Sequence, residues 1–177
     1  MKNFKGAVQA DAYAGFHHLY ANGAIYEVAC WAHARRKLHD IHAIHASPIT
    51  TEALARIGAL YRIEEEVRGK PAELRREVRQ TRAKPLLEEL RNWMEKSLRS
   101  LSTKSETAGA IRYALARWCA LTRYIDDGRL EIDNSVAERA LRAVLAQIAD
   151  HPVSQISQLL PWNLISVPGA NTSPKAA

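Results

Sequence analysis

The hydrophobic and polar positions near the start of the chain form two kinds of pattern, one typical of strands and one typical of helices. Short apolar runs at residues 6–10 and 24–31, the second rich in Ile, Tyr, Val and Trp, predict two strands. The segment 11–23 between them ends in Asn-Gly and predicts a short helix, and the segment that begins "HARRK" is helical in composition. This part of the chain is therefore expected to run strand, helix, strand, helix.

The middle of the chain predicts helices almost throughout. Ser47 is the expected cap of a first helix, whose apolar residues recur every three or four positions until Gly69. A second helix is expected over residues 71–101, and Pro85 should break or kink it because proline lacks a backbone donor. A third helix is expected over 105–125. The pattern indicates a long helical block.

The last part of the chain predicts two more helices. One is expected to begin at Asp133 or Asn134 and to run to about Ala149, and a shorter one, "SQISQLL", follows. The small and polar residues 165–177 predict a disordered tail.

Composition narrows the class of protein. Hydrophobic residues make up 47% and charged residues 25% of 177 residues, a balance typical of soluble globular proteins. No apolar run reaches the ~20 residues of a membrane span, and no secretory signal is visible, so a cytoplasmic location is expected. Two distant cysteines, Cys30 and Cys119, exclude a disulfide scaffold, and both are expected to be buried. The net charge of +6 is compatible with nucleic-acid binding.

Two acidic positions have both a structural and a chemical interpretation. Asp11 follows a predicted strand, where a carboxylate can serve a metal or catalytic site, but it can equally cap the next helix. Asp133, Asn134 and Glu138 suit a capped helix, with Asn134 and Glu138 on one face. Taken one at a time, these residues favour capping.

Three cations follow the second predicted strand closely. The helix dipole opposes positive charge at a helix start, where His33 is followed by Arg35, Arg36 and Lys37, so the cluster is more favourable if it meets an anion. Phosphate is one candidate, and salt bridges to the glutamates of the middle helices are another. The cluster indicates either an anion site or a structural one.

A further set of histidines offers a second metal hypothesis. They are spaced by three on a predicted helix, which spreads them around it rather than onto one tight face. A histidine-based metal protein is therefore a minor alternative, carried by His39, His42 and His45.

The order of the segments is more specific than any of them alone. "VQADAYAGFHHLY", "ACWAHARRKLHDIH", "RYALARWCALTRYIDDGRLEIDNSVAERALR" and "IADHPVSQISQLLPWNL" resemble, in this order, transposases of the insertion-sequence-66 family, over about residues 6–164. The resemblance implies an α+β, mostly helical fold that contains part of an RNase H-like domain with a helical insertion. It implies these parts: RNase H-like strands and helices at 1–46, the insertion at 47–128, a Glu-bearing helix and C-terminal helix at 129–164, and the tail at 165–177.

The resemblance also implies an activity, namely metal-dependent DNA cleavage and strand transfer at transposon ends. Such enzymes hold two Mg²⁺ (or Mn²⁺) ions with an Asp-Asp-Glu triad, of which Asp11 resembles the second acid and Glu138 the third. The residues that would contact DNA are His33, Arg35, Arg36, Arg139 and Arg142.

The chain departs from the family pattern in three places. The family's first Asp lies upstream of the block that begins here, Ser135 stands where a second Asn is usual, and Val144 runs directly into "LAQIADHP" where family members carry a further segment. We therefore expect a transposase fragment that is inactive alone. The alternative is a non-catalytic helical module that binds DNA, full-length transposase or another copy of itself.

Overall fold

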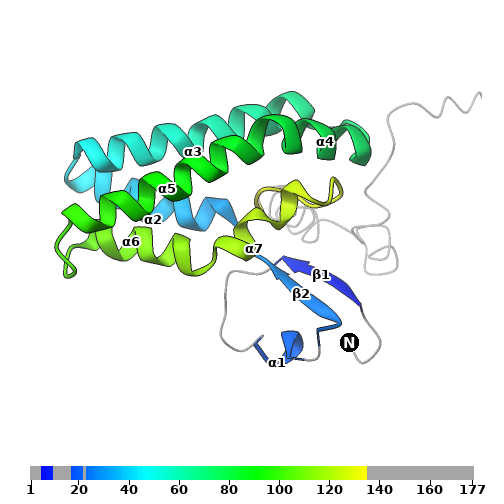
Figure 1. Cartoon of the computed structure of the whole chain (residues 1–177), viewed down its shortest axis with the longest axis horizontal. Coiled ribbons are helices and arrows are strands. Elements are labelled where there is room, and N and C mark those ends of the chain that lie inside the picture. The colour runs from blue at the N-terminus through cyan, green and yellow to red at the C-terminus, as the bar shows by residue number, and fades with distance from the viewer. Residues whose placement is uncertain (1–4, 10–16, 22, 135–177) are drawn as a thin grey trace, which may run out of the picture. The chain divides into compact units, whose positions relative to one another are not determined.

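The computed structural model describes residues 5–9, 17–21 and 23–134 (Figure 1). The chain divides into two compact units, and all described residues belong to the first, Met1–Asn134. The expected Glu-bearing helix, the C-terminal helix and the tail lie outside the described residues. So do four of the expected site residues: Asp11, Glu138, Arg139 and Arg142.

The two predicted strands form a small parallel sheet. Strand β1 (Gly6–Gln9) pairs with β2 (Ile25–Val28), so that Gln9 lies opposite Val28. The short helix α1 (His17–Tyr20) lies in the connection, as parallel strands require a crossover. β2 ends three residues before the expected residue 31, because Trp31 already begins the next helix and its indole is fully buried.

Helices make up most of the described chain. In Figure 1, α2, α3, α5 and α6 lie alongside one another, and α2 and α5 each contact both α3 and α6. The arrangement is a helical bundle with the sheet at one end, so the mostly helical α+β expectation is confirmed. The helical elements are α2 (Trp31–Ile44), α3 (Pro48–Val67), α4 (Ala72–Val78), the π-helical turn η2 (Arg79–Ala83), α5 (Lys84–Ser100), α6 (Glu106–Ala116), α7 (Trp118–Thr122) and the 3₁₀ turn η3 (Arg123–Ile125).

Helix α3 begins and ends as its sequence predicts. The Ser47 hydroxyl accepts from the Thr50 backbone N–H, while the Thr50 hydroxyl accepts from the Ser47 N–H, which closes a capping box. Beyond the last turn, Gly69 adopts a φ of 74°, a backbone conformation that favours glycine. Both ends therefore depend on contacts between residues close in sequence.

The predicted kink at Pro85 takes the form of a change in helical register. The π-helical turn η2 precedes the proline, and the Lys84 N–H donates to the Arg79 carbonyl five residues earlier. The wider turn lets helix continue into α5 although Pro85 has no donor of its own. The chain therefore stays helical from α4 through η2 into α5.

The prediction of one helix over 105–125 was wrong at Arg117, where α6 ends. The break lets α7 meet the chain at the end of β2: the Ala29 N–H donates to the Ala120 carbonyl at 3.0 Å. The buried Trp31 indole likewise donates to the Leu121 carbonyl at 2.9 Å. Hydrogen bonds to a distant segment therefore decide where this helix is interrupted.

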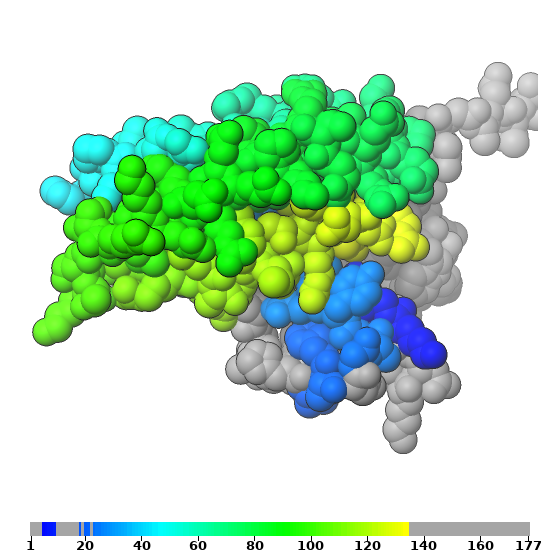
Figure 2. Space-filling view, in the orientation of Figure 1, coloured from blue at the N-terminus to red at the C-terminus, as the bar shows by residue number. Residues whose placement is uncertain are grey.

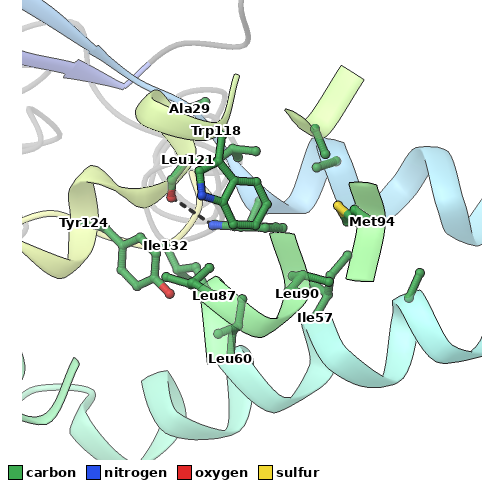
Figure 3. Packing of buried hydrophobic residues seen from close by; sticks show 14 of the residues in the cluster. Ala29, Ile57, Leu60, Leu87, Leu90, Met94, Trp118, Leu121, Tyr124 and Ile132 are labelled. Atoms are coloured by element: carbon green, nitrogen blue, oxygen red, sulfur yellow. Dashed lines mark hydrogen bonds between the residues drawn. The ribbon is translucent and has the colours of Figure 1, made fainter. Parts of the chain in front are cut away.

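The core fills the space between the bundle helices (Figure 3). Leu60, Leu90 and Met94 have no exposed surface, and Trp31 meets Trp118 edge to face at 5.8 Å between ring centroids. Figure 2 shows the chain near residue 130, in yellow, between the green helices and the blue strands. No helix within the described ranges is long and apolar enough to cross a membrane.

The two cysteines differ in exposure. Cys30 is buried, as predicted, but Cys119 is exposed, so that prediction was wrong. The reason is tertiary, since the short helix α7 turns Trp118 and Ala120 inward and Cys119 outward.

Candidate functional site

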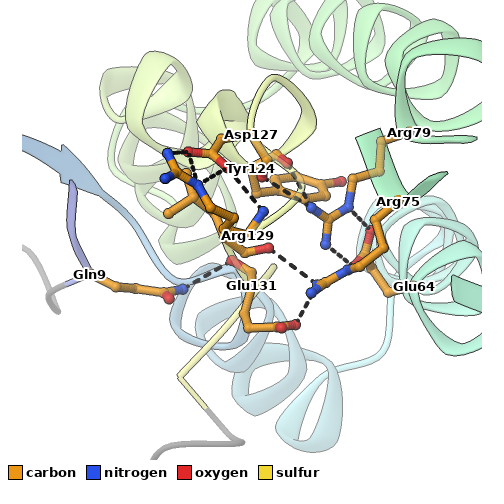
Figure 4. Close-up of polar contacts among 9 residues, drawn as sticks. Gln9, Glu64, Arg75, Arg79, Tyr124, Asp127, Arg129 and Glu131 are labelled. Carbon is orange, nitrogen blue, oxygen red and sulfur yellow. Dashed lines mark hydrogen bonds and ion pairs between the residues drawn. The ribbon is translucent and has the colours of Figure 1, made fainter. Parts of the chain in front are cut away.

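The carboxyl end of β1 meets the segment that leads toward Glu138. The Gln9 side-chain amide donates to the Glu131 carbonyl at 3.1 Å, a contact between residues 122 positions apart (Figure 4). Asp11 lies two residues beyond Gln9, and Glu138 lies seven beyond Glu131. The structure thus joins the described neighbours of the two expected acids, although the acids themselves lie outside the described residues.

The start of α2 meets the same segment. The Trp31 N–H donates to the Ile132 carbonyl at 3.1 Å, and the Asn134 N–H contacts the Cys30 sulfur at 3.4 Å. We call this meeting point, built from Gln9, Cys30, Trp31 and residues 130–134, the strand–helix junction. It brings three separated parts of the chain together.

A buried carboxylate lies within the strand–helix junction. Asp133 is 9% exposed, and its carboxylate lies beside the Tyr61 hydroxyl of α3. Burial, and then the charge of Asp133, raise the pKa of Tyr61 above its ordinary value. Burial also raises the pKa of the Cys30 thiol, with a smaller contribution from Asp133. Asp133 therefore stands at the start of α2, where the helix dipole favours a negative charge.

The expected cationic residues lie on the first turns of α2. Because α2 begins at Trp31, Arg35 and Arg36 fall in its second turn, where the dipole opposes them less than expected. Both are exposed, whereas His33 in the first turn is partly buried. Arg35 is close enough to Tyr61 to lower the pKa of its hydroxyl slightly against the larger raising effects. Their exposure leaves the two arginines accessible to an anion.

The histidine hypothesis finds little support in the geometry. The His42 Nδ1 in the last turn of α2 lies 2.9 Å from the Thr50 hydroxyl in the first turn of α3, and His39 lies beside Asp40 at 3.7 Å. Within the described part of the chain, no three His, Cys, Asp or Glu side chains are grouped to hold a metal ion. His42 thus has a structural partner.

A buried ion pair beneath the junction was not predicted. Arg79 on η2 is fully buried and meets Glu64 of α3 through two hydrogen bonds, of 2.8 and 2.6 Å (Figure 4). Its remaining donors reach the carbonyls of Tyr124 and Asp127 at 2.9 and 3.3 Å. The pair therefore holds the backbone of the loop that precedes the junction.

A second arginine continues this contact along the loop. Arg75, one turn before Arg79, donates to the Leu130 carbonyl at 3.2 Å and to the Glu131 carboxylate at 2.8 Å. The signal in the sequence was the i,i+4 spacing of Arg75 and Arg79 in "ELRREVRQ", which places both on one helix face. Their partners in the loop, however, lie about 45 to 56 residues further along the chain.

The turn between η3 and the junction is tightly packed against α4. A Cβ at Gly128 would lie 1.7 Å from the Ala72 carbonyl oxygen, so only glycine fits there. Next to it, Arg129 hydrogen-bonds to Asp127 and holds the pKa of that carboxyl at about 2. Packing and charge together shape this turn.

The comparisons place the chain among transposases, the class that the order of its sequence segments resembled. The model of the transposase IS66 family matches residues 1–147, and the chain belongs to that family. No solved structure matches the chain.

The curated relatives are longer proteins. The uncharacterized protein y4qI of Sinorhizobium fredii (strain NBRC 101917 / NGR234) is 41% identical over 149 residues, covering 80% of this chain and 28% of y4qI. The uncharacterized protein y4hP of the same strain is 31% identical over 221 residues, covering 92% of this chain and 40% of y4hP. The chain thus spans less than half of either relative. Because 221 aligned positions exceed the 177 residues of the chain, y4hP has residues inside the match that this chain lacks.

Proposed function

We propose that this chain is the later part of a metal-dependent transposase catalytic domain with an RNase H-like core, in which Asp11 and Glu138 bind the metal. The observation that carries the proposal is the hydrogen bond between Gln9 and Glu131, which joins the strand end to the segment before Glu138. Family membership gives the transposase class, and the contact between Gln9 and Glu131 supports the proposal that the two acids meet.

Covalent geometry supports the meeting of the two acids. A residue advances the chain by at most ~3.6 Å, so the Cα of Asp11 lies within ~7 Å of the Cα of Gln9. By the same limit, the Cα of Glu138 lies within ~14 Å of the Cα of Asn134, and within ~6 Å if the intervening residues are helical. The length of chain therefore permits the two acids to share one site, as the resemblance implies.

The chemistry of the donors suits Mg²⁺ or Mn²⁺. Asp11 and Glu138 are carboxylates, and the flanking side chains of Gln9 and Glu131 also carry oxygen, the ligand atom that hard cations prefer. A divalent cation bound there would activate the attacking hydroxyl and stabilise the leaving oxygen of a phosphodiester. Asp133, held beside Tyr61, positions the start of the segment rather than binding the ion.

The cations of α2 are proposed as DNA contacts. Arg35 and Arg36 are exposed on a helix that begins at the junction, and His33 lies one turn before them. Phosphate groups of a bound strand would therefore lie near the acids. Arg139 and Arg142 follow Glu138 closely in sequence and are proposed as further contacts.

The expected division of the chain is also retained as a proposal. Residues 1–46 and 129–164 would form the catalytic part, 47–128 the helical insertion and 165–177 a tail. Arg75 and Arg79 of the insertion hydrogen-bond to the loop at 124–131. The proposed role of the insertion is therefore to hold the segment that leads to Glu138.

Metal binding tests the proposal. The purified protein is titrated with Mn²⁺, followed by electron paramagnetic resonance, and Asp11→Asn and Glu138→Gln should each weaken binding. Asp40→Asn, which removes an exposed carboxylate of α2, is the matched control and should leave the affinity unchanged. Equal Mn²⁺ affinity in all four proteins would contradict the assignment.

Cleavage assays test the expected inactivity of the 177-residue polypeptide alone. With two of the three family acids, it should not cleave transposon-end DNA in the presence of Mg²⁺ or Mn²⁺. Cleavage that Glu138→Ala abolishes would show instead that these residues form a complete site.

The charge of the chain favours one second candidate function. The net charge of +6 and the exposed arginines of α2 suit a helical module that binds DNA without catalysis. In the same non-catalytic role the module would associate with full-length transposase or with another copy of itself. Binding that weakens with salt and is unaffected by Glu138→Gln would support this candidate. The absence of DNA binding at low salt would count against it.

A further inference from the structure

A cleft of about 540 Å³ lies between β2 and the α6–α7 junction, apart from the residues assigned above. Its volume falls within the ~300–1,000 Å³ of small-ligand sites. The side chains that matter for its chemistry come from four elements and the residue between α6 and α7: Tyr26, Arg91, Arg117, Trp118, Cys119 and Arg123.

The charge of the cleft is mainly positive. Arg91, Arg117 and Arg123 contribute three guanidinium groups, against the single carboxylate of Glu27 among the lining side chains. Arg91 also pairs with Glu95 at 3.0 Å, but both side chains are about half exposed and can exchange partners. Such a concentration of positive charge favours an anionic ligand.

Two of these guanidinium groups are already held in place. The Arg117 guanidinium lies 4.1 Å from the centroid of the Tyr113 ring, and that of Arg123 lies 5.4 Å from the Tyr26 ring. Arg123 also donates to the Glu27 carbonyl. A ligand that meets them therefore finds donors whose conformational freedom is already reduced.

The walls of the cleft also offer aromatic and polar groups. Tyr26 is partly exposed. The buried hydroxyl of Tyr20, another lining residue, has no hydrogen-bond partner within the described part of the chain. Arginines combined with aromatic rings are the usual means of binding single-stranded nucleic acid, because phosphates meet the cations and bases stack on the rings.

We propose that this cleft binds a nucleotide of single-stranded DNA. Its phosphate meets Arg117 and Arg123, and its base lies against the Tyr26 side of the cleft. The inference rests on the proposed function for its partner, DNA, but it concerns a different surface from the α2 cations. A single strand becomes available next to a transposase site whenever a duplex end is opened.

Cys119 provides a direct probe of the cleft. It is exposed on the cleft wall, whereas Cys30, the other cysteine of the chain, is 4% exposed. A maleimide should therefore alkylate Cys119 first in the folded protein. A short oligo-dT strand at low salt is expected to slow this reaction several-fold, whereas a duplex of the same length should protect it less. Cys119→Ser identifies the labelled site.

Arginine variants test whether the oligonucleotide binds in the cleft or elsewhere on the surface. Arg117→Met should reduce the protection and lower the slope of log affinity against log salt by about 0.7, the value per phosphate contact of a single strand. Arg99→Met removes an exposed arginine near the C-terminal end of α5 that does not line the cleft, and it is the matched control. It should leave the protection of Cys119 unchanged.

The outcomes distinguish this inference from the proposed function. If oligo-dT binds but leaves Cys119 fully reactive, the cleft is not the binding site. Equal protection of Cys119 by the duplex would also contradict the proposal of a single-strand site. Neither result affects the Mn²⁺ titration of Asp11→Asn and Glu138→Gln, which decides the proposed metal site separately.

Discussion

The ion pair between Glu64 and Arg79 should be the most sensitive polar contact in the described part of the chain. Arg79 is fully buried and Glu64 is 4% exposed, so Glu64→Gln leaves a buried guanidinium without its counter-charge. Losing one partner of a buried pair costs ~3–5 kcal/mol. Because Arg79 keeps its two bonds to backbone carbonyls, we expect the lower end, about 3 kcal/mol.

Urea unfolding followed by tryptophan fluorescence measures this loss. With a slope of about 2 kcal/mol/M, a loss of 3 kcal/mol lowers the midpoint by about 1.5 M. The control is Glu66→Gln, which removes a carboxylate from the same helix α3 but from an exposed pair with Arg82. Its midpoint should barely change, because surface pairs are screened by water.

Equal midpoints for Glu64→Gln and Glu66→Gln would refute the reasoning. They would mean that the buried pair contributes no more to stability than the exposed one. The contacts of Arg79 with the loop would then be a consequence of the fold rather than a cause of it.

Three further predictions concern the loop and the helix ends. Gly128→Ala should destabilise the protein strongly in urea unfolding, because the added Cβ would lie 1.7 Å from a carbonyl oxygen. The control is Gly109→Ala inside α6, where the Cβ meets open space, and it should be neutral or stabilising by up to ~1 kcal/mol. Ser47→Ala removes the cap of α3 and should cost ~1 kcal/mol, and an unchanged melting temperature would contradict the capping box. The Asp127 carboxyl group should titrate with a pKa of about 2 in an NMR pH titration, below its ordinary pKa of 3.8. Its pairing with Arg129 therefore stabilises the fold above pH 3.8 and is lost as the pH falls towards 2, so Asp127→Asn should make stability less dependent on pH in that range.

Local rules predicted much of this fold from the sequence. The bounds of α3 at Ser47 and Gly69 and the perturbed helix before Pro85 depend on residues close in sequence, and the structure agrees with these predictions. The hydrophobic pattern also predicted the two strands, although the second ends at Val28 rather than at residue 31. The order of the segments also indicated the transposase family, which the match over residues 1–147 confirms. A cap or a proline acts within one turn of helix, so its effect can be predicted without a partner from elsewhere.

Contacts between distant residues decided the rest. The break at Arg117, the outward-facing Cys119 and the bonds from Arg79 to the loop depend on packing against segments far away in the chain. The same holds for the bond from Gln9 to Glu131, which crosses 122 positions. Sequence named Asp11 and Glu138 as acids of one site through resemblance. The tertiary structure brings together only their described neighbours, because folding is what places the end of β1 against Glu131, and the shared site of the two acids is a proposal.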